Sequence, residues 1–128
     1  MLIDCHVHLI SAKGYAEKLV EEMDRLSIDM VCLLAGPRIK FWGSRMASND
    51  EVLAAWRKYP DRLIPFGFVE LGVDPPSLVD ALHAAGFRGL KLTRTLHPYN
   101  DDRLMAYYAR AAALGLPILP YRHAAAYR

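Results

Sequence analysis

Two histidines lie one residue apart in the opening segment "MLIDCHVHLI". If this segment is an extended strand, alternate side chains share a face, which puts Asp4, His6 and His8 together. Cys5 and Val7 would then lie on the other face. Two neutral imidazoles held side by side supply half of the ligands of a first-row divalent metal. The same spacing also arises by chance on an ordinary half-buried strand, so the metal hypothesis depends on the rest of the chain.

The composition describes a single globular domain. The chain has 128 residues, of which 53% are hydrophobic and 23% charged, with a formal net charge of +2. A chain of this length buries a core, so we expect one domain over residues 1–128. The basic residues are scattered among acidic ones, which argues against nucleic acid or an anionic membrane as a partner.

Other features of the sequence indicate a cytoplasmic protein. The N-terminal apolar run is interrupted by Asp4, His6 and His8, unlike a signal peptide, and no apolar stretch has the length of a membrane span. Cys5 and Cys32 both lie inside apolar runs. There a small hydrophobic packing role is commoner than a disulfide or a nucleophile, so we expect both to be packing residues.

Strand-like and helix-like segments alternate along the chain. Apolar runs typical of strands occur at residues 2–9, 28–36, 62–71, 87–93 and 116–121. Apolar spacing and capping signals predict helices at residues 14–26, from Asn49 or Asp50 until Pro60, at 75–86 and at 101–115. The repeat is about thirty residues, the size of a βα unit.

This alternation predicts an α/β fold with a parallel sheet. Right-handed crossovers between neighbouring strands favour a curved sheet of five strands in the order 1-2-3-4-5, with the helices on the convex outer face. A doubly wound sheet with helices on both faces is the competing arrangement. On the inner face we expect Ile3, Leu33, Phe66 and Leu90, or their neighbours, to be open to water.

The segment 37–48, "PRIKFWGSRMAS", is longer than a plain connection. Three basic residues flank Phe41 and Trp42, namely Arg38, Lys40 and Arg45. A basic and aromatic nucleic-acid patch is one interpretation. A mobile loop near the active face, serving as a substrate lid, is the interpretation we favour.

With the strands placed, "IDCHVHL" resembles the opening of the amidohydrolase superfamily of metal-dependent (β/α)8-barrel enzymes. The later segments "YPDRLIPFGFVEL", "HAAGFRGLKLT" and "AALGLPIL" are similar to the third, fourth and fifth strand regions of its amidohydrolase-related branch. That branch includes hydrolases and non-oxidative decarboxylases of aromatic acids. The resemblance implies a partial (β/α)8 TIM barrel with its active site at the carboxyl ends of the strands.

The resemblance also implies a divalent metal, with zinc expected, that activates a water or polarises a substrate carbonyl or carboxylate. His6 and His8 match the two ligands of the first strand. The family pattern places a histidine after the fifth strand where this chain has Tyr121, so the nearest imidazole, His123, is the third candidate ligand. The expected histidine after a sixth strand and aspartate after an eighth strand have no counterpart.

Four further polar residues are candidates for the site. Lys91, in "GLKL", falls where some barrels of the superfamily carry a carboxylated lysine, although this is not the rule in the branch. A buried ammonium needs a partner, so we expect Lys91 to serve at the active face or in a structural ion pair. His97 either contacts substrate or is a solvated loop residue. Asp4 is expected to be structural, and His83 to be a packing residue.

A complete barrel needs eight βα units and about 250 residues, so we interpret the chain as truncated or interrupted. The function implied is metal-dependent hydrolysis of a small carboxylated or cyclic substrate. A non-oxidative decarboxylase, a non-catalytic remnant that binds a metal or another chain, and a His-x-His phosphoesterase or nuclease are the alternatives. Alone, the chain is expected to have no appreciable turnover and to self-associate or pair with a complementary chain.

Overall fold

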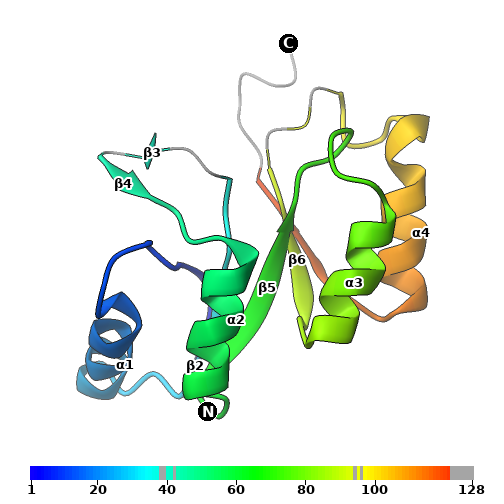
Figure 1. Cartoon of the computed structure of the whole chain (residues 1–128). Coiled ribbons are helices and arrows are strands. Elements are labelled where there is room, and N and C mark those ends of the chain that lie inside the picture. The colour runs from blue at the N-terminus through cyan, green and yellow to red at the C-terminus, as the bar shows by residue number, and fades with distance from the viewer. Residues whose placement is uncertain (38–39, 42, 94, 96, 122–128) are drawn as a thin grey trace.

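The computed structural model describes residues 1–37, 40–41, 43–93, 95 and 97–121 (Figure 1). Its main element is a parallel sheet of five strands, β1 (Ile3–His8), β2 (Met30–Leu34), β5 (Leu63–Val69), β6 (Gly89–Leu92) and β7 (Ile118–Pro120). The helices between them are α1 (Tyr15–Arg25), α2 (Asn49–Lys58), α3 (Ser77–Ala85) and α4 (Met105–Ala113). The predicted alternation of strands and helices is therefore confirmed.

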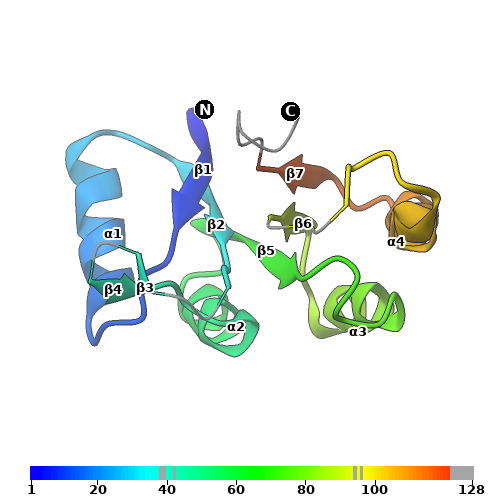
Figure 2. The same ribbon diagram turned by 90° about the horizontal axis from the view of Figure 1, so that it is seen from above.

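The strands lie in the order β1-β2-β5-β6-β7, which is their order along the chain. Seen from above, the sheet curls, and all four helices lie on its convex side (Figure 2). This confirms the predicted topology and is incompatible with a doubly wound sheet, which would place β1 inside the sheet. Instead β1 and β7 are the two edges.

The helix ends follow the predicted signals with two shifts. Ser48, one residue before the expected cap, is the N-cap of α2 and forms a capping box with Glu51. The acidic residues before α4 lie in a separate 3-10 turn, Asp102–Leu104, capped by the side chain of Asp101. In each case a side-chain oxygen accepts from a free N–H group of the first turn, Ser48 at α2 and Asp101 at the 3-10 turn.

Two apolar clusters cover the two faces of the sheet. The larger cluster fills the layer between sheet and helices and includes Leu33 and Leu90, which are 0% and 1% exposed. The smaller one lies on the inner face and consists of Cys32, Leu34 and Phe66. Of the residues expected on the inner face, Phe66 lies there, whereas at Leu33 and Leu90 it is the neighbours along the strands that face inward. The expected exposure was wrong for this cluster, since Phe66 is 7% and Leu34 0% exposed. The runs "VCLLA" and "GLKL" are apolar throughout, apart from the lysine. They therefore do not indicate which residues of these strands face the helices and which face inward.

The long segment after β2 contains a short antiparallel hairpin that the sequence did not predict. Its strands, β3 (Lys40–Phe41) and β4 (Ser44–Arg45), have two residues each, too few for a periodic pattern. Arg38 and Trp42, on which the basic and aromatic interpretation partly depended, lie outside the described residues. Among the helices that the structure describes, each falls short of the length and apolar character needed to cross a bilayer.

Candidate metal centre

Strand β1 carries a bulge at the position of the His-x-His motif. Its register pairs Asp4 with Val31 and then Val7 with Leu33, so Cys5 and His6 together lie opposite a single residue of β2. Paired residues of neighbouring strands point to the same face. Asp4 therefore shares the helix-facing side with Val31, and the expectation that it shares a face with both histidines was wrong.

The side chain of Asp4 takes part in this irregularity. Its Oδ1 accepts a hydrogen bond of 2.9 Å from the backbone N–H of His6. A short carboxylate that captures a backbone N–H two residues on competes with regular strand pairing. This is a structural role, as expected for Asp4, and it fixes the backbone from which His6 projects.

The two imidazoles of the motif meet at their outer nitrogens. The Nε2 atoms of His6 and His8 are 3.2 Å apart, and the ring centroids are 5.1 Å apart with the planes tilted by 59°. Two histidines bound to one tetrahedral zinc at about 2.0–2.1 Å would place these nitrogens about 3.3 Å apart. The observed separation of the two nitrogens matches that of a shared metal. Without a metal, the same distance suits an N–H···N hydrogen bond.

Both imidazoles are held in the neutral form that metal ligation requires. Burial, together with the smaller effects of the positive charges of His6 and Lys91, lowers the pKa of His8 to about 4. Burial and the charge of Lys91 also lower the pKa of His6, opposed by Asp4. The Nδ1 atom of His8 is buried and has no hydrogen-bond partner in the described part of the chain.

The structure does not bring a third ligand to the pair. Within the described residues, no group of three or more histidine, cysteine, aspartate or glutamate side chains is placed to hold a metal. His123, the third candidate, lies outside the described residues. A catalytic zinc typically has three protein ligands and one open position. Within the described residues the pair alone is therefore one ligand short of such a site.

Lys91 lies on the inner face together with the two imidazoles, whose pKa values its charge lowers. It is 1% exposed, and its Nζ is 5.7 Å from the ring centroid of Tyr121. From the sequence alone, Tyr121 is distinguished only as the residue at the position of an expected histidine. Its position two residues after Leu119, the register partner of Lys91, was the signal that the two side chains meet.

The remaining histidines lie elsewhere. His97 is half-buried in the loop after β6, where its backbone N–H donates to Thr95 Oγ1 at 3.1 Å and its carbonyl accepts from the same hydroxyl at 2.8 Å. No described contact joins it to the imidazole pair. His83 is exposed on α3, so the packing role expected for it was wrong. Its apolar neighbours face the sheet, and the helix turns His83 away from them.

The two cysteines differ in environment, and both are free. Cys32 is buried in the inner cluster, as expected of a packing residue. Burial, and the neighbouring Cys5 and Asp4, raise the pKa of its thiol to about 11. Cys5 is exposed on the edge strand, so the packing role expected for it was wrong.

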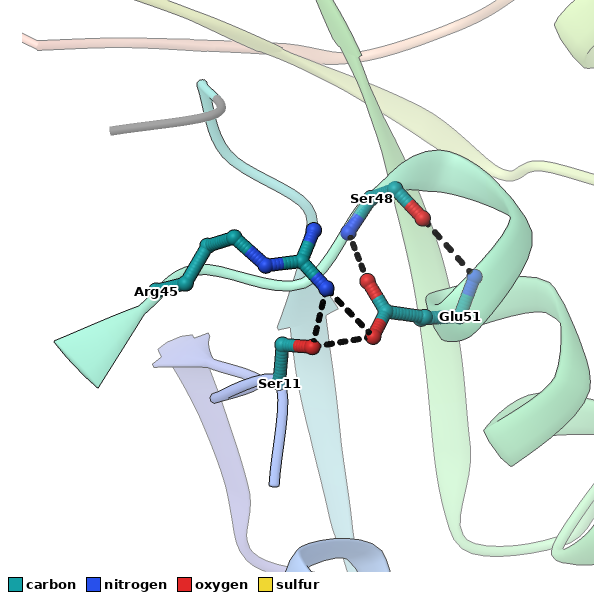
Figure 3. Close-up of polar contacts among 4 residues, drawn as sticks. All are labelled: Ser11, Arg45, Ser48 and Glu51. Carbon is teal, nitrogen blue, oxygen red and sulfur yellow. Dashed lines mark hydrogen bonds and ion pairs between the residues drawn. The ribbon is translucent and has the colours of Figure 1, made fainter. Parts of the chain in front are cut away.

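A polar network fixes the loop that follows β1 (Figure 3). Ser11 Oγ donates to Glu51 Oε1, and Arg45 Nη2 donates to Ser11 Oγ at 2.5 Å and to Glu51 Oε1 at 3.3 Å. The other carboxylate oxygen of Glu51 accepts from the N–H of Ser48 at 2.7 Å. Burial raises the pKa of Glu51, but these hydrogen bonds outweigh it and hold the pKa below its usual value. No sequence pattern pointed to this network, because its members come from three separate segments.

With this geometry in place, the chain can be compared with known proteins. The sequence profile of the family described as Amidohydrolase matches residues 3–126. The chain belongs to the amidohydrolase family. No curated protein matches it significantly.

Solved structures of amidohydrolase-like barrels resemble this family member in fold. A probable 2-pyrone-4,6-dicarboxylic acid hydrolase from Acinetobacter baumannii, with citric acid bound, has a TM-score of 0.71 and 17% identity, over 94% of this chain and 49% of that chain. An uncharacterised TIM-barrel protein from Bordetella bronchiseptica has a TM-score of 0.68 and 19% identity, over 93% of this chain and 54% of that chain. A protein from Agrobacterium tumefaciens has a TM-score of 0.58 and 17% identity, over 93% and 46%.

These similarities define the architecture of this amidohydrolase. At identities under one fifth they show the fold alone, which is a partial TIM barrel of five parallel strands and four helices. The chain spans about half the length of the structures that it matches. In such barrels the active site lies at the carboxyl ends of the strands, which is where His8 ends β1.

Proposed function

We propose that this chain belongs to a metal-dependent hydrolase and supplies two of its metal ligands, His6 and His8. The observation that carries the proposal is the 3.2 Å separation of their Nε2 atoms. It is supported by the lowered pKa of both rings, for which partial burial is the largest cause. Zinc is the metal that this ligand type favours. When bound, the metal would lower the pKa of a water molecule or polarise a carbonyl for hydrolysis.

The residues around the pair would position it and limit its access to water. The bulge, held by Asp4, presents the His6 ring beside the His8 ring at the end of β1. The inner cluster of Cys32, Leu34 and Phe66 provides an apolar floor from the neighbouring strands. A floor of this kind would exclude solvent from the side of the pair that faces it, and electrostatic interactions there would be stronger.

For the substrate we propose a small carboxylated or cyclic molecule. One structural relative is named as a probable 2-pyrone-4,6-dicarboxylic acid hydrolase and was crystallised with citric acid. 2-Pyrone-4,6-dicarboxylic acid and citric acid both carry several carboxyl groups, and the relative is named a hydrolase. This favours hydrolysis over non-oxidative decarboxylation.

The metal site can be tested by calorimetric titration of the tag-free chain with Zn²⁺. We expect the wild-type chain to bind one zinc weakly and the double variant His6→Ala, His8→Ala to lose that site. The matched control is His83→Ala, His97→Ala, which removes two imidazoles away from the pair and should bind like the wild type. Equal isotherms for the wild type and the His6, His8 double variant would refute the proposal.

A further inference from the structure

Lys91 is the single charged side chain that is buried among the residues the structure describes. It is 1% exposed, and its Nζ has no hydrogen-bond partner within the described part of the chain. An ammonium group carries three N–H donors and no acceptor. Buried charges in proteins are normally paired, so an unpaired one at the candidate active face requires an explanation.

The fold places Lys91 on the side of the sheet where the imidazole pair lies. Its neighbours Leu90 and Leu92 belong to the cluster between sheet and helices, so alternation along β6 turns Lys91 inward. Its register partners are Phe68 in β5 and Leu119 in β7, the second of which packs against the inner cluster. The position is held by two neighbouring strands and not by a loop.

The groups around Lys91 do not neutralise it. The titratable side chains that interact electrostatically with Lys91 are His6 and His8. The pKa of each imidazole is lowered, so neither favours the positively charged form. Burial alone lowers the pKa of Lys91, with no carboxylate in the described residues to offset it. The ring of Tyr121, 5.7 Å from Nζ, is near the limit for a cation–π contact. A structural ion pair, one of the two expected roles, is absent from the described residues.

We propose that Lys91 is the anchor for a carboxylate of the substrate and holds that substrate beside the imidazole pair of His6 and His8. The inference rests on the proposed function, because it assigns the carboxylated substrate of that site. A carboxylate requires one positive charge and accepts charge-assisted hydrogen bonds from an ammonium. A phosphate dianion is better served by several cations or by a helix N-terminus, so it is the less suitable ligand.

Tyr121 governs access to this anchor. It follows β7 directly and is 48% exposed, while its ring lies over the Nζ of Lys91. In the proposal the ring covers the ammonium in the absence of substrate, and the incoming carboxylate takes its place.

The test is a binding titration of the full chain with isophthalate, a cyclic dicarboxylate that cannot be hydrolysed, with and without Zn²⁺. Isophthalamide, the neutral diamide of the same shape, is the ligand control, and inorganic phosphate is the competing anion. The variants are Lys91→Met, which keeps the length of the side chain, Lys91→Arg, which keeps its charge, and Lys18→Met, which removes an exposed lysine from α1. Spectra of the ¹⁵N-labelled lysine side chains report directly on which ammonium responds.

We expect isophthalate to shift the Lys91 signal and Lys91→Met to weaken its binding at least about tenfold, the loss of one charge-assisted contact. Lys91→Arg should retain part of the affinity, and Lys18→Met should retain all of it. Equal binding of isophthalate to Lys91→Met and wild type, equal binding of the diamide, or tighter binding of phosphate would overturn the inference. If Lys91→Met does not fold, the lysine spectra of the wild type decide the matter, because an unmoved Lys91 signal contradicts the anchor.

Zinc titration separates this inference from the proposed function. Lys91→Met should still bind Zn²⁺, since both imidazoles remain. Isophthalate binding that depends on Lys91, in a chain that binds no zinc through His6 and His8, would contradict the metal site and leave the anchor standing. Zinc binding through His6 and His8, together with isophthalate binding that does not depend on Lys91, would contradict the anchor alone.

Discussion

At the scale of single residues, the imidazole pair depends on a local conflict in β1. The sequence predicted that His6 and His8 lie together, and they do, at 3.2 Å between Nε2 atoms. The prediction assumed the alternating side chains of a regular strand, whereas in the structure a bulge lies between the two ends of β1. Asp4 captures the N–H of His6 and the register shifts by one residue. Side-chain competition for backbone groups of this kind is not visible in a hydrophobic pattern.

The two thiols provide a prediction at this scale. At pH 7.5 we expect one thiol of the folded chain, Cys5, to react readily with a water-soluble disulfide reagent. Cys32 should react only on unfolding, because it is buried and its pKa is raised to about 11, which leaves almost no thiolate. The number of fast-reacting thiols per chain measures this.

The variant Cys5→Ser should therefore have no fast-reacting thiol, while Cys32→Ser should keep one. Rapid modification of Cys32 in the folded Cys5→Ser chain would show that the inner cluster is open to solvent.

At the scale of elements, the N-terminus of α2 joins several segments near the mouth of the sheet. Glu51 completes the capping box of the helix and accepts from Ser11 and Arg45, which belong to the loop after β1 and to β4. The backbone of the same two segments is joined directly, since the N–H of Ser11 donates to the carbonyl of Arg45 at 2.8 Å. One carboxylate thus holds the helix end and both loops.

This carboxylate should make stability depend on pH. The folded pKa of Glu51 lies below its usual value of about 4.3, so its contribution is present above that value and is lost as the pH falls through the folded pKa. We expect Glu51→Gln to lower the free energy of unfolding by on the order of 1 kcal/mol at pH 7. The difference from wild type should shrink below about pH 4. Urea unfolding at a series of pH values measures it.

Glu21→Gln, at an exposed position of α1, is the control and should differ little from wild type at every pH. A difference between Glu51→Gln and wild type that stays constant down to pH 3 would argue that the charge of Glu51 contributes nothing.

A second contact of α2 involves the sheet itself. The side chain of Asn49 accepts from the N–H of Phe68 at 2.7 Å and donates to the carbonyl of the same residue at 3.0 Å. Asn49→Ala would leave both backbone groups without these partners, at a cost of about 2 kcal/mol in the free energy of unfolding. Chemical denaturation of Asn49→Ala beside Asn100→Ala, an exposed asparagine in a turn, checks this. Equal stability of the two variants would mean that water replaces the amide.

At the scale of the whole molecule, much of the fold could be predicted from the sequence. The strands, the helices and their order depend on local apolar patterns and on crossover handedness, and these were confirmed. The faces of Leu33 and Leu90 could not be assigned, because their strands are buried on both sides and apolar almost throughout. The contact of Ser11 with Glu51 joins residues 40 positions apart and leaves no local trace.

The two free edges of the sheet give a prediction about association. The inner cluster of Cys32, Leu34 and Phe66 is buried, so an exposed inner core does not drive association, but within the described residues β1 and β7 each have one unpaired edge. The chain expressed alone should therefore self-associate. Ile3→Lys, which places a charge on the exposed part of β1, should shift it toward the monomer. Light scattering after size-exclusion chromatography measures the mass.

Val73→Lys, which changes an exposed apolar side chain away from both edges, should leave the association unchanged. The same samples should hydrolyse no member of a lactone, amide and aromatic-acid panel with added zinc, because a catalytic zinc needs three protein ligands and the described residues offer no group of three. An active monomer would contradict both expectations.

The contact between Asn49 and Phe68 has a further consequence for how this barrel accommodates variation. β2 ends at Leu34, whose register partner in β5 is Phe66. Phe68, two residues further on, has no partner in β2, and the amide side chain of Asn49 in α2 bonds to its N–H and carbonyl instead. The side chain acts as a one-residue substitute for a strand. Ala35 N–H still donates to the carbonyl of Phe66 at 3.1 Å, but beyond Ala35 the described residues between β2 and α2 give no backbone hydrogen bond to β5. Exchanges at Gly43 and Ser44, in the hairpin turn, can therefore reshape the rim near the imidazole pair while the hydrogen bonding of β5 stays complete.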